Sequence, residues 1–342
     1  MKIALCDAGL KNADIEREIY GRFGFELEVR ICRTAEDVIA FGREADALCI
    51  CQHPANARVI SELKRCRILA RYGAGLDTVD IAAATRAGIV VTNVPHAAVH
   101  EVSEHAISLL LACIRRIVNH DRRIRSGEWG IYEKEPVYRI HGKTLGVIGL
   151  GAIARKLVAK LRGFELRVLA CDPFVKPEVA RVLNVELVSL DQLLSESDYV
   201  TIHAPLNDQT RHLINAQTIE RMKSQAILVN CSRGALVDTA ALADALRKRR
   251  IAAAGVDVHE TEPPPRNYAL YELDNVIVSD HAAWYSEDSV AQIQREAAEG
   301  VVAVLTGKRP ANLVNPEVYE VLAGKQVGSN RTGGPSTSPT ML

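Results

Sequence analysis

The chain has 342 residues, and its 42 lysine and arginine residues balance 42 aspartate and glutamate residues, so the formal net charge is zero. A hydrophobic content of 48% is enough to form buried cores, and the length is typical of about two domains. A neutral chain without a basic stripe is not expected to bind nucleic acid. Its apolar runs fall short of the roughly 18 residues that a membrane span needs, so no membrane association is expected.

Both ends of the chain and the cysteines give coarse expectations. The amino terminus, MKIALCDAGLKNAD, turns polar after its first strand-like run, which indicates a domain start rather than a signal peptide. The eight cysteines include no CxxC pair, which predicts reduced thiols and a cytoplasmic location. The tail over residues 321–342 is rich in glycine, serine, threonine and proline, so it is predicted to be disordered.

Strand-like apolar runs alternate with helix-length segments in the first hundred residues. The predicted strands cover residues 3–6, 47–51, 68–72 and 89–93. A long helix over residues 99–126 should follow, with apolar residues at helical spacing that are by default buried within the chain. These residues are Ile107, Leu110, Leu111, Ile114 and Val118.

The stretch over residues 143–173 is the most informative part of the sequence. It reads as a strand, a glycine turn, a helix, a second strand and a terminal acid, which is the first half of a dinucleotide-binding unit. Gly149 suits a tight turn, Gly151 allows the backbone to approach a pyrophosphate, and Ala154 takes the third small position. A GxGxxA pattern alone is often only a tight turn, but here every neighbouring element is in register.

The acid at the end of this stretch bears on the choice of cofactor. Asp172 lies about 20 residues beyond the glycines, at the position where a carboxylate hydrogen-bonds the adenosine ribose in dinucleotide-binding units. A carboxylate repels a 2′-phosphate, and the next residues are Pro173 and Phe174 rather than arginine. NAD is therefore predicted over NADP.

The rest of the chain completes the predicted organisation. Further strands are expected over residues 199–203, 226–230, 253–257 and 276–279, and a helix over residues 286–305 should return to the first unit. The fold class is predicted as α/β, with two Rossmann-like or flavodoxin-like domains built on parallel sheets. A discontinuous substrate domain (1–98 plus 286–320) would enclose an NAD-binding domain (99–285), with the active site in the cleft between them.

Three chemically distinct side chains follow strands of the second unit, where open α/β sheets place their ligands. Arg233 could bind a carboxylate through two hydrogen bonds, and His281 could donate a proton. Glu262 could pair with the histidine and modulate its pKa. Each alone has an ordinary alternative: a surface ion pair for Arg233, a turn cap for Glu262 and a structural role for His281. Glu260 shares a face with Glu262 in an extended segment, so periodicity cannot separate these two acids.

A histidine and glutamate cluster at the start of the long helix raises the question of a metal. It comprises His96, His100, Glu101, Glu104 and His105. Spacings of four and five residues could converge on one helix face. Because the segment begins the bridging helix and no reaction step calls for a metal, we interpret the cluster as structural and expect no metal site.

Several motifs together resemble one family. GLGAIA with Asp172, NCSRGALVD, GVDVHETEP and DHAAW look like those of the D-isomer-specific 2-hydroxyacid dehydrogenases, and the similarity runs over nearly the whole chain apart from the tail. RYGAGLDTVDI, NVP and HAAWYSE are most similar to the C-terminal-binding proteins, a branch of transcriptional corepressors with a dehydrogenase fold.

The resemblance implies roles for particular residues. Arg233 would bind the substrate carboxylate and polarise the carbonyl, and His281 would be the acid/base, paired with Glu262 because of the Glu-Pro match. The substrate would contact Arg71, Tyr72, Gly73, Ala74, Gly75, Arg233 and Trp284. The NAD cofactor would be lined by Ala74, Ile148, Gly149, Leu150, Gly151, Ala152, Ile153, Asp172, Ala204, Pro205, Leu206, Asn207, Thr210, Cys231, Ser232, Arg233, Asp257 and His281.

The implied activity is hydride transfer between NAD and the C2 atom of a small 2-hydroxy or 2-oxo acid, with a homodimer formed through the long helix. Trp284 and the few basic residues near the site favour an uncharged substrate side chain over a phosphorylated one. Asp280 replaces the proline that often precedes the histidine, with an effect that the sequence leaves open. The alternative is an NAD(H)-sensing, corepressor-like scaffold with weak or vestigial activity.

Overall fold

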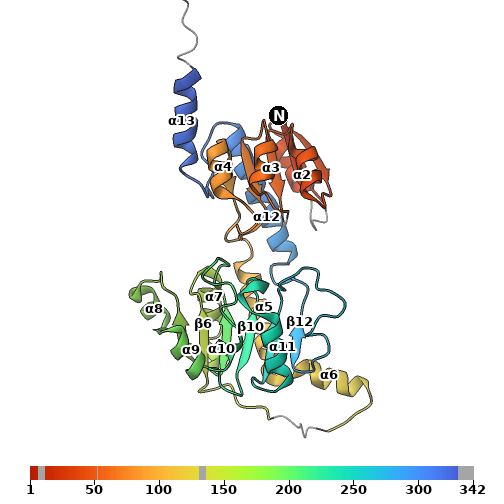
Figure 1. Cartoon of the computed structure of the whole chain (residues 1–342), viewed down its shortest axis with the longest axis vertical. Helices are drawn as coiled ribbons and strands as arrows, with labels where there is room; N and C mark the ends of the chain where they lie inside the picture. The colour runs from red at the N-terminus through yellow and green to blue at the C-terminus, as the bar shows by residue number, and fades with distance from the viewer. Residues whose placement is uncertain (7–11, 52, 131–135, 330–342) are drawn as a thin grey trace, which may run out of the picture. The chain divides into compact units, whose positions relative to one another are not determined.

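The computed structural model describes residues 1–6, 12–51, 53–130 and 136–329. The chain divides into two compact units, Met1–Ala97 with Glu287–Leu342 and Ala98–Ser286 (Figure 1). No helix in the described part of the chain combines the length and the apolar character needed to cross a membrane. The same residues contain no disulfide, and their cysteines are mostly buried.

The first unit is built on a parallel sheet in the order β2-β1-β3-β4-β5, which is the flavodoxin-like order. Its strands are β1 (Lys2–Cys6), β2 (Glu26–Arg30), β3 (Ala47–Ile50), β4 (Ile68–Arg71) and β5 (Val90–Thr92). Its helices are α1 (Asp14–Gly21), α2 (Ala35–Gly42), α3 (Ala57–Glu62), α4 (Ile81–Ala87), α12 (Glu287–Leu305) and α13 (Val318–Ser329).

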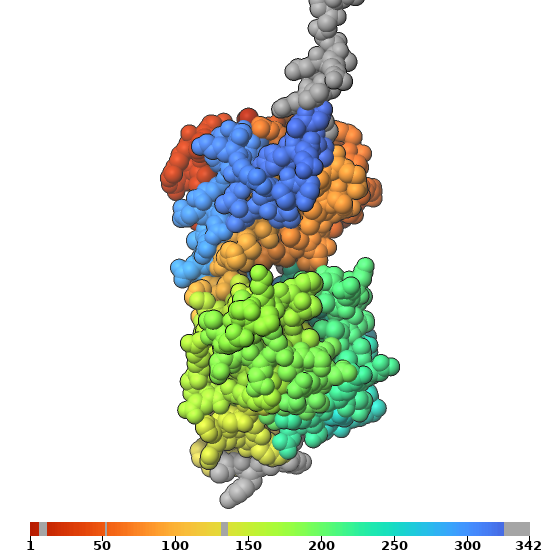
Figure 2. Space-filling model, turned by 90° about the vertical axis from the view of Figure 1, so that its left-hand side faces the viewer, coloured from red at the N-terminus to blue at the C-terminus, as the bar shows by residue number. Residues whose placement is uncertain are grey.

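The carboxyl-terminal segment returns to the first unit, as Figure 2 shows for the blue residues beside the red and orange ones. On α12, the Gln294 amide donates to the buried Glu16 carboxylate at 2.8 Å. Asn315 is also buried, and it accepts from the Val91 N–H at 2.7 Å while donating to the Ile89 carbonyl at 3.0 Å. These contacts fix two distant parts of the sequence in one core.

The second unit carries a parallel sheet in the order β12-β11-β10-β9-β6-β7-β8, the Rossmann order with one further strand. Its strands are β6 (Thr144–Ile148), β7 (Arg167–Cys171), β8 (Glu186–Leu187), β9 (Tyr199–Ile202), β10 (Ile227–Asn230), β11 (Ala253–Val256) and β12 (Val276–Val278). Its helices are α5 (Val99–Arg115), α6 (Ile117–Arg125), α7 (Ala152–Lys160), α8 (Pro177–Leu183), α9 (Leu190–Glu196), α10 (Ala216–Ile219) and α11 (Thr239–Arg247). The predicted fold class is confirmed.

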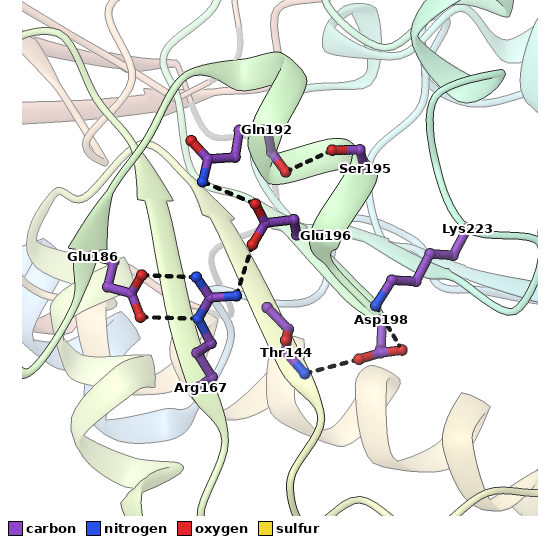
Figure 3. Close-up of polar contacts among 8 residues, drawn as sticks. All are labelled: Thr144, Arg167, Glu186, Gln192, Ser195, Glu196, Asp198 and Lys223. Carbon is purple, nitrogen blue, oxygen red and sulfur yellow. Dashed lines mark hydrogen bonds and ion pairs between the residues drawn. The ribbon is translucent and has the colours of Figure 1, made fainter.

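Charged side chains secure the outer strands of this sheet (Figure 3). Arg167 on β7 donates to both oxygens of Glu186 on β8, at 2.9 and 2.8 Å, and to Glu196 at 2.7 Å. Near the amino end of β6, the Asp198 carboxylate accepts from the Thr144 N–H at 2.9 Å. The two-residue strand β8 is therefore held to β7 by an exposed ion pair as well as by backbone pairing, and a run of two residues is too short to be predicted from the sequence.

Two other predictions of secondary structure need correction. The helix expected over residues 99–126 is two helices, because Arg116 takes the left-handed conformation with a φ of 54° and its N–H bonds back to the end of α5. The edge strand β2 was missed, since its sequence ELEVR is mostly charged and exposed.

The predicted disorder from residue 321 is wrong for residues 321–329, which continue α13. This stretch begins Val-Leu-Ala and includes Lys325 and Gln326, whose helix propensity offsets two glycines. The remainder of the predicted tail, residues 330–342, lies outside the described residues.

The central strand β6 yields a stability prediction. A Cβ atom on Gly146 would lie 2.4 Å from the Ser197 Oγ and 2.5 Å from the Leu193 Cδ2. We expect Gly146→Ala to lower the free energy of unfolding by about 1–3 kcal/mol through overpacking, measured by urea denaturation. Gly163→Ala is the control, because no atom lies within 4 Å of its Cβ position. Equal stability of the two variants would contradict this packing.

Candidate active site

The glycine turn after β6 is shaped by close backbone packing. Gly149 has a φ of 86°, and a Cβ there would lie 2.8 Å from the Ala204 N and 2.9 Å from the His203 carbonyl carbon. Its N–H donates to the Cys171 carbonyl at 2.9 Å. At Gly151, which is the N-cap of α7, no atom lies within 4 Å of the Cβ position. The first glycine is therefore required by the protein's own packing, while the second leaves its surface open.

Asp172 braces this turn as well as ending β7. One carboxylate oxygen accepts from the Leu150 N–H at 2.7 Å, and the other accepts from the N–H groups of Phe174 and Val175 at 2.8 and 3.1 Å. The acid therefore lies against the glycine turn, as a dinucleotide site requires. Its role in ordering the turn itself was not predicted.

These residues suit NAD. A helix amino terminus with open space at Gly151 can receive a pyrophosphate, because its N–H groups and the helix dipole favour an anion. Asp172 lies directly beside it, at the position where dinucleotide-binding units carry an acid. The second unit thus provides both elements of a dinucleotide site at one edge of its sheet.

Other predicted cofactor residues of this unit follow neighbouring strands at the same edge. In the loop after β9, the Asn207 side chain accepts from the Thr210 N–H at 3.1 Å, and the Thr210 hydroxyl donates to the Pro205 carbonyl at 2.7 Å. After β10, the Ser232 hydroxyl donates to the Ile202 carbonyl at 2.8 Å. Strand ends, neighbouring loops and the start of α7 also carry Ile148, Ala152, Ile153, Leu206 and Cys231.

A fully buried carboxylate organises the loop after β12. The Asp257 side chain accepts from the Ser279 hydroxyl at 2.6 Å and from the N–H groups of Ala282 and Ala283 at 2.9 and 3.0 Å. The His105 Nε2 lies 3.4 Å from the same carboxylate and 3.0 Å from the Ser279 Oγ. Asp257 was predicted among the cofactor-lining residues, and its side chain also holds this loop together, a role that was not predicted.

The charge of Asp257 is stabilised by these donors. Burial raises the pKa of its carboxyl, but hydrogen bonds from His105, Ser279 and the Ala283 N–H outweigh burial and hold the pKa at about 2. The group is therefore ionised throughout the neutral range.

Arg233 lies between β10 and a short 3₁₀ turn. Its Nη1 donates to the Ser232 carbonyl at 2.8 Å, and the side chain is half-buried. The next residue, Gly234, packs on the backbone joining His259 to Glu260: a Cβ there would lie 1.9 Å from the His259 carbonyl carbon. Arg233 is thus fixed beside the segment that carries Glu262.

Glu262 and His281 form a hydrogen-bonded pair. The His281 Nδ1 donates to one carboxylate oxygen at 2.7 Å, and the other oxygen accepts from the His259 N–H at 2.9 Å. The His281 N–H also donates to the Asp257 carbonyl at 2.8 Å, and His281 has a φ of 57°. With Nδ1 occupied, Nε2 is the ring nitrogen left for a substrate.

The carboxylate of this pair is held in its charged form. Burial raises the pKa of Glu262, but hydrogen bonds from His281 and the His259 N–H outweigh burial, so its pKa lies below the ordinary value. About a third of each side chain is exposed, so the pair remains accessible from solvent.

Glu260, the other acid considered for this position, makes different contacts. One oxygen lies 2.6 Å from the His212 Nε2, and the other accepts from the Thr239 N–H at 3.0 Å. The geometry therefore pairs Glu262, rather than Glu260, with His281. Asp280, directly before the histidine, is exposed.

The histidine and glutamate cluster of α5 spreads its contacts over separate partners. Glu104 pairs with Lys160 of α7 at 2.6 Å, and Glu101 accepts from the Ser286 hydroxyl at 2.8 Å, whereas His105 contacts Ser279. Within the described residues, no group of three or more His, Cys, Asp or Glu side chains is arranged to hold a metal ion.

The substrate-binding residues predicted over 71–75 belong to the first unit, at the end of β4 and in the loop after it. The Arg71 Nη1 donates to the Tyr72 carbonyl at 2.7 Å, and a Cβ on Gly73 would lie 1.6 Å from this same nitrogen. Gly73 therefore makes room for the guanidinium group. Asn93 donates to the Ala74 carbonyl at 2.8 Å and steadies the same loop.

Trp284 belongs to the second unit, where it packs edge-on against Tyr285 with ring centroids 5.8 Å apart. The structure thus gathers Arg233, Glu262 and His281 within one unit and places residues 71–75 in the other. The sequence does not reveal the contacts of His259, Tyr268 and Ser279 or the link to His105, because no motif encodes these contacts.

A cavity of about 200 Å³ lies away from this site. Its lining includes residues at the amino ends of the strands, among them Tyr199, Ile227, Ala253 and Val276. The residues of the candidate site follow the carboxyl ends of the same sheet, so this cavity takes no part in it.

Known proteins share both the sequence and the fold. Residues 107–283 match the family described as "D-isomer specific 2-hydroxyacid dehydrogenase, NAD binding domain". The chain is 39% identical over 283 residues to a glyoxylate reductase of Korarchaeum cryptofilum, covering 82% of this chain and 85% of that protein. It is also 38% identical over 293 residues to a D-3-phosphoglycerate dehydrogenase of Archaeoglobus fulgidus.

The second match covers 85% of this chain and 55% of the dehydrogenase, so it spans about half of that relative. Among solved structures, the apo D-lactate dehydrogenase of Escherichia coli superposes with a TM-score of 0.79 at 31% identity, covering 92% of this chain and 100% of that one. These named relatives are reductases and dehydrogenases, and none of them supports the corepressor branch in particular. The chain belongs to the D-isomer specific 2-hydroxyacid dehydrogenase family and is an NAD-dependent oxidoreductase.

Proposed function

We propose that the chain reduces a small, unphosphorylated 2-oxo acid to the 2-hydroxy acid, with Arg233, Glu262 and His281 as its reacting side chains. The observation that carries the proposal is the 2.7 Å pair between Glu262 and His281, at the same sheet edge as the glycine turn. The likeness to glyoxylate reductases supports a small substrate.

Arg233 is the proposed clamp for the substrate. A guanidinium group can fork two hydrogen bonds onto a carboxylate and draw charge from the neighbouring carbonyl. Its loop is fixed by the packing of Gly234 on the backbone at His259, so the cation needs little reorganisation when substrate arrives. The proposed contacts of Arg71 and Gly73–Gly75 with substrate stay predictions.

His281 is the proposed proton donor. When bound, the reduced nicotinamide would supply a hydride to the carbonyl carbon, which leaves negative charge on the carbonyl oxygen. The imidazole donates the proton to the carbonyl oxygen from Nε2, because Nδ1 is already bound to Glu262. The carboxylate stabilises the charged ring before transfer and orients it afterwards.

No feature of the described residues specifically supports the alternative of an NAD(H)-sensing scaffold. An NAD(H) sensor would not need a histidine, a glutamate and an arginine arranged for proton transfer and carboxylate binding. Tight NADH binding without turnover of a 2-oxo-acid panel (glyoxylate, pyruvate, hydroxypyruvate, phenylpyruvate) would favour that alternative. A cytoplasmic location is part of the same proposal.

We also propose a homodimer, with α6 as its contact. Leu110 and Ile114 are buried in the unit's own core, as expected by default, whereas Ile117 and Ile124 on α6 are 57% and 53% exposed. Apolar side chains on a helix without buried residues favour burial against a second copy. Sedimentation should show a dimer that Ile124→Glu dissociates; a monomeric wild-type chain would contradict this contact.

The proton-transfer pair gives the first prediction for activity. His281→Ala should lower kcat about 10²- to 10⁴-fold, and Glu262→Gln should move the pH optimum for reduction downward because the protonated imidazole loses its carboxylate partner. Both are measured by the NADH absorbance change with a 2-oxo acid.

Glu260→Gln is a matched control, because it breaks a comparable carboxylate–histidine contact with His212 in the same segment. It should leave kcat and the pH profile nearly unchanged. Full turnover by His281→Ala, or an equal effect of the two glutamate variants, would overturn the assignment.

Cofactor preference gives the second prediction. Asp172→Asn removes the charge that repels a 2′-phosphate. Its amide oxygen can still accept from the Leu150 N–H, although its nitrogen then faces the N–H groups of Phe174 and Val175, so the fold of the variant must be checked. We expect the ratio of kcat/KM for NADH to kcat/KM for NADPH to fall about tenfold, the effect of one nearby charge in a solvent-exposed site. An unchanged ratio, with the variant folded, would show that Asp172 does not select the cofactor.

A further inference from the structure

We propose that His259 is a positioning residue, whose imidazole ties the segment that carries Glu262 to the loop that carries His281. We further propose that the Tyr268 hydroxyl selects its tautomer. The inference rests on the proposed function, in which this pair transfers the proton.

The imidazole of His259 bridges two chain segments. It is only 8% exposed, and its Nε2 lies 2.9 Å from the Ser279 carbonyl oxygen. A carbonyl oxygen only accepts hydrogen bonds, so Nε2 carries the proton and donates it. Ser279 stands two residues before His281, so this bond fixes the approach of the histidine loop.

The second ring nitrogen has a partner of complementary character. The His259 Nδ1 lies 3.0 Å from the Tyr268 hydroxyl oxygen, and the two rings meet edge to face at 87° with centroids 5.2 Å apart. In a neutral ring with its proton on Nε2, Nδ1 accepts, so the Tyr268 O–H donates. Burial, the main influence, raises the pKa of Tyr268 and keeps the hydroxyl a donor.

The backbone of His259 completes the connection. Its N–H donates to one Glu262 oxygen at 2.9 Å, while the other Glu262 oxygen accepts from His281 at 2.7 Å. Its carbonyl carbon packs against Gly234, next to Arg233. One buried residue therefore contacts all three segments that carry the proposed reacting side chains.

An ordinary core histidine is the alternative to be excluded. Phenylalanine would fill nearly the same volume, so a residue needed only for packing should tolerate that replacement. The positioning role instead requires the two ring nitrogens. The titratable groups around the ring are Tyr268, Glu260, Glu262 and His281, and a pH profile must be interpreted with all four in mind.

The test compares three variants with the wild-type enzyme. His259→Phe removes both ring hydrogen bonds, Tyr268→Phe removes only the Nδ1 partner, and His259→Gln retains an amide donor that can approach the Ser279 carbonyl. Steady-state kinetics with NADH and a 2-oxo acid gives kcat, KM for each reactant and the pH profile. Side-chain ¹⁵N NMR gives the His259 tautomer without reference to activity.

We expect His259→Phe to lower kcat about 10- to 100-fold, since small misplacements of reacting groups are costly. Its KM for NADH should stay unchanged, and its pH profile should shift in the direction of Glu262→Gln. His259→Gln should recover part of kcat. The wild-type ring should carry its proton on Nε2, and Tyr268→Phe should mix the tautomers.

A folded His259→Phe with wild-type kcat and pH profile would overturn the inference, as would a wild-type ring protonated on Nδ1. If His259→Phe does not fold, Tyr268→Phe and His259→Gln decide, and wild-type kinetics in both would count against the role. Absence of wild-type turnover would refute the proposed function instead. The NMR tautomer would still test the geometry.

Discussion

The buried carboxylate of Asp257 is the constraint on which the candidate site depends. It is fully enclosed, yet its donors hold its pKa at about 2, below the ordinary 3.8. Because the folded-state pKa is lowered, this group stabilises the fold above about pH 4 by about 2 kcal/mol, a contribution lost as pH falls towards 2. Its oxygens bind Ser279, Ala282 and Ala283, so the loop has one arrangement, and His281 takes a positive φ within it.

Much of this arrangement follows from patterns in the sequence. Continuous apolar runs such as Thr144 to Ile148 indicate buried parallel strands, and the carboxyl ends of such strands share an edge. The sequence therefore predicts that residues just after these strands, such as Arg233, Asp257 and His281, lie near one another. The glycine turn with Asp172 could be predicted for the same reason, since its chemistry requires fixed spacings.

The remainder depends on tertiary contacts that leave little local trace. The sequence around Arg116 does not predict a helix break, because it contains neither glycine nor proline. The edge strand β2 is stabilised by pairing with β1 although its side chains are polar. Glu260 and Glu262 would share a face in an extended segment, but they lie in a loop that directs Glu262 to His281 and Glu260 to His212. His259 looks like any core histidine until its two nitrogen partners are known.

The most direct test is kcat for 2-oxo-acid reduction by Asp257→Asn at saturating NADH. The amide nitrogen would present a donor where the carboxylate now accepts from backbone N–H groups, so the loop should lose its single arrangement. We expect a folded protein whose kcat falls at least about 100-fold, because His281 would no longer be held at the substrate's carbonyl oxygen. A folded variant with wild-type kcat would contradict the claim that this buried charge orders the site.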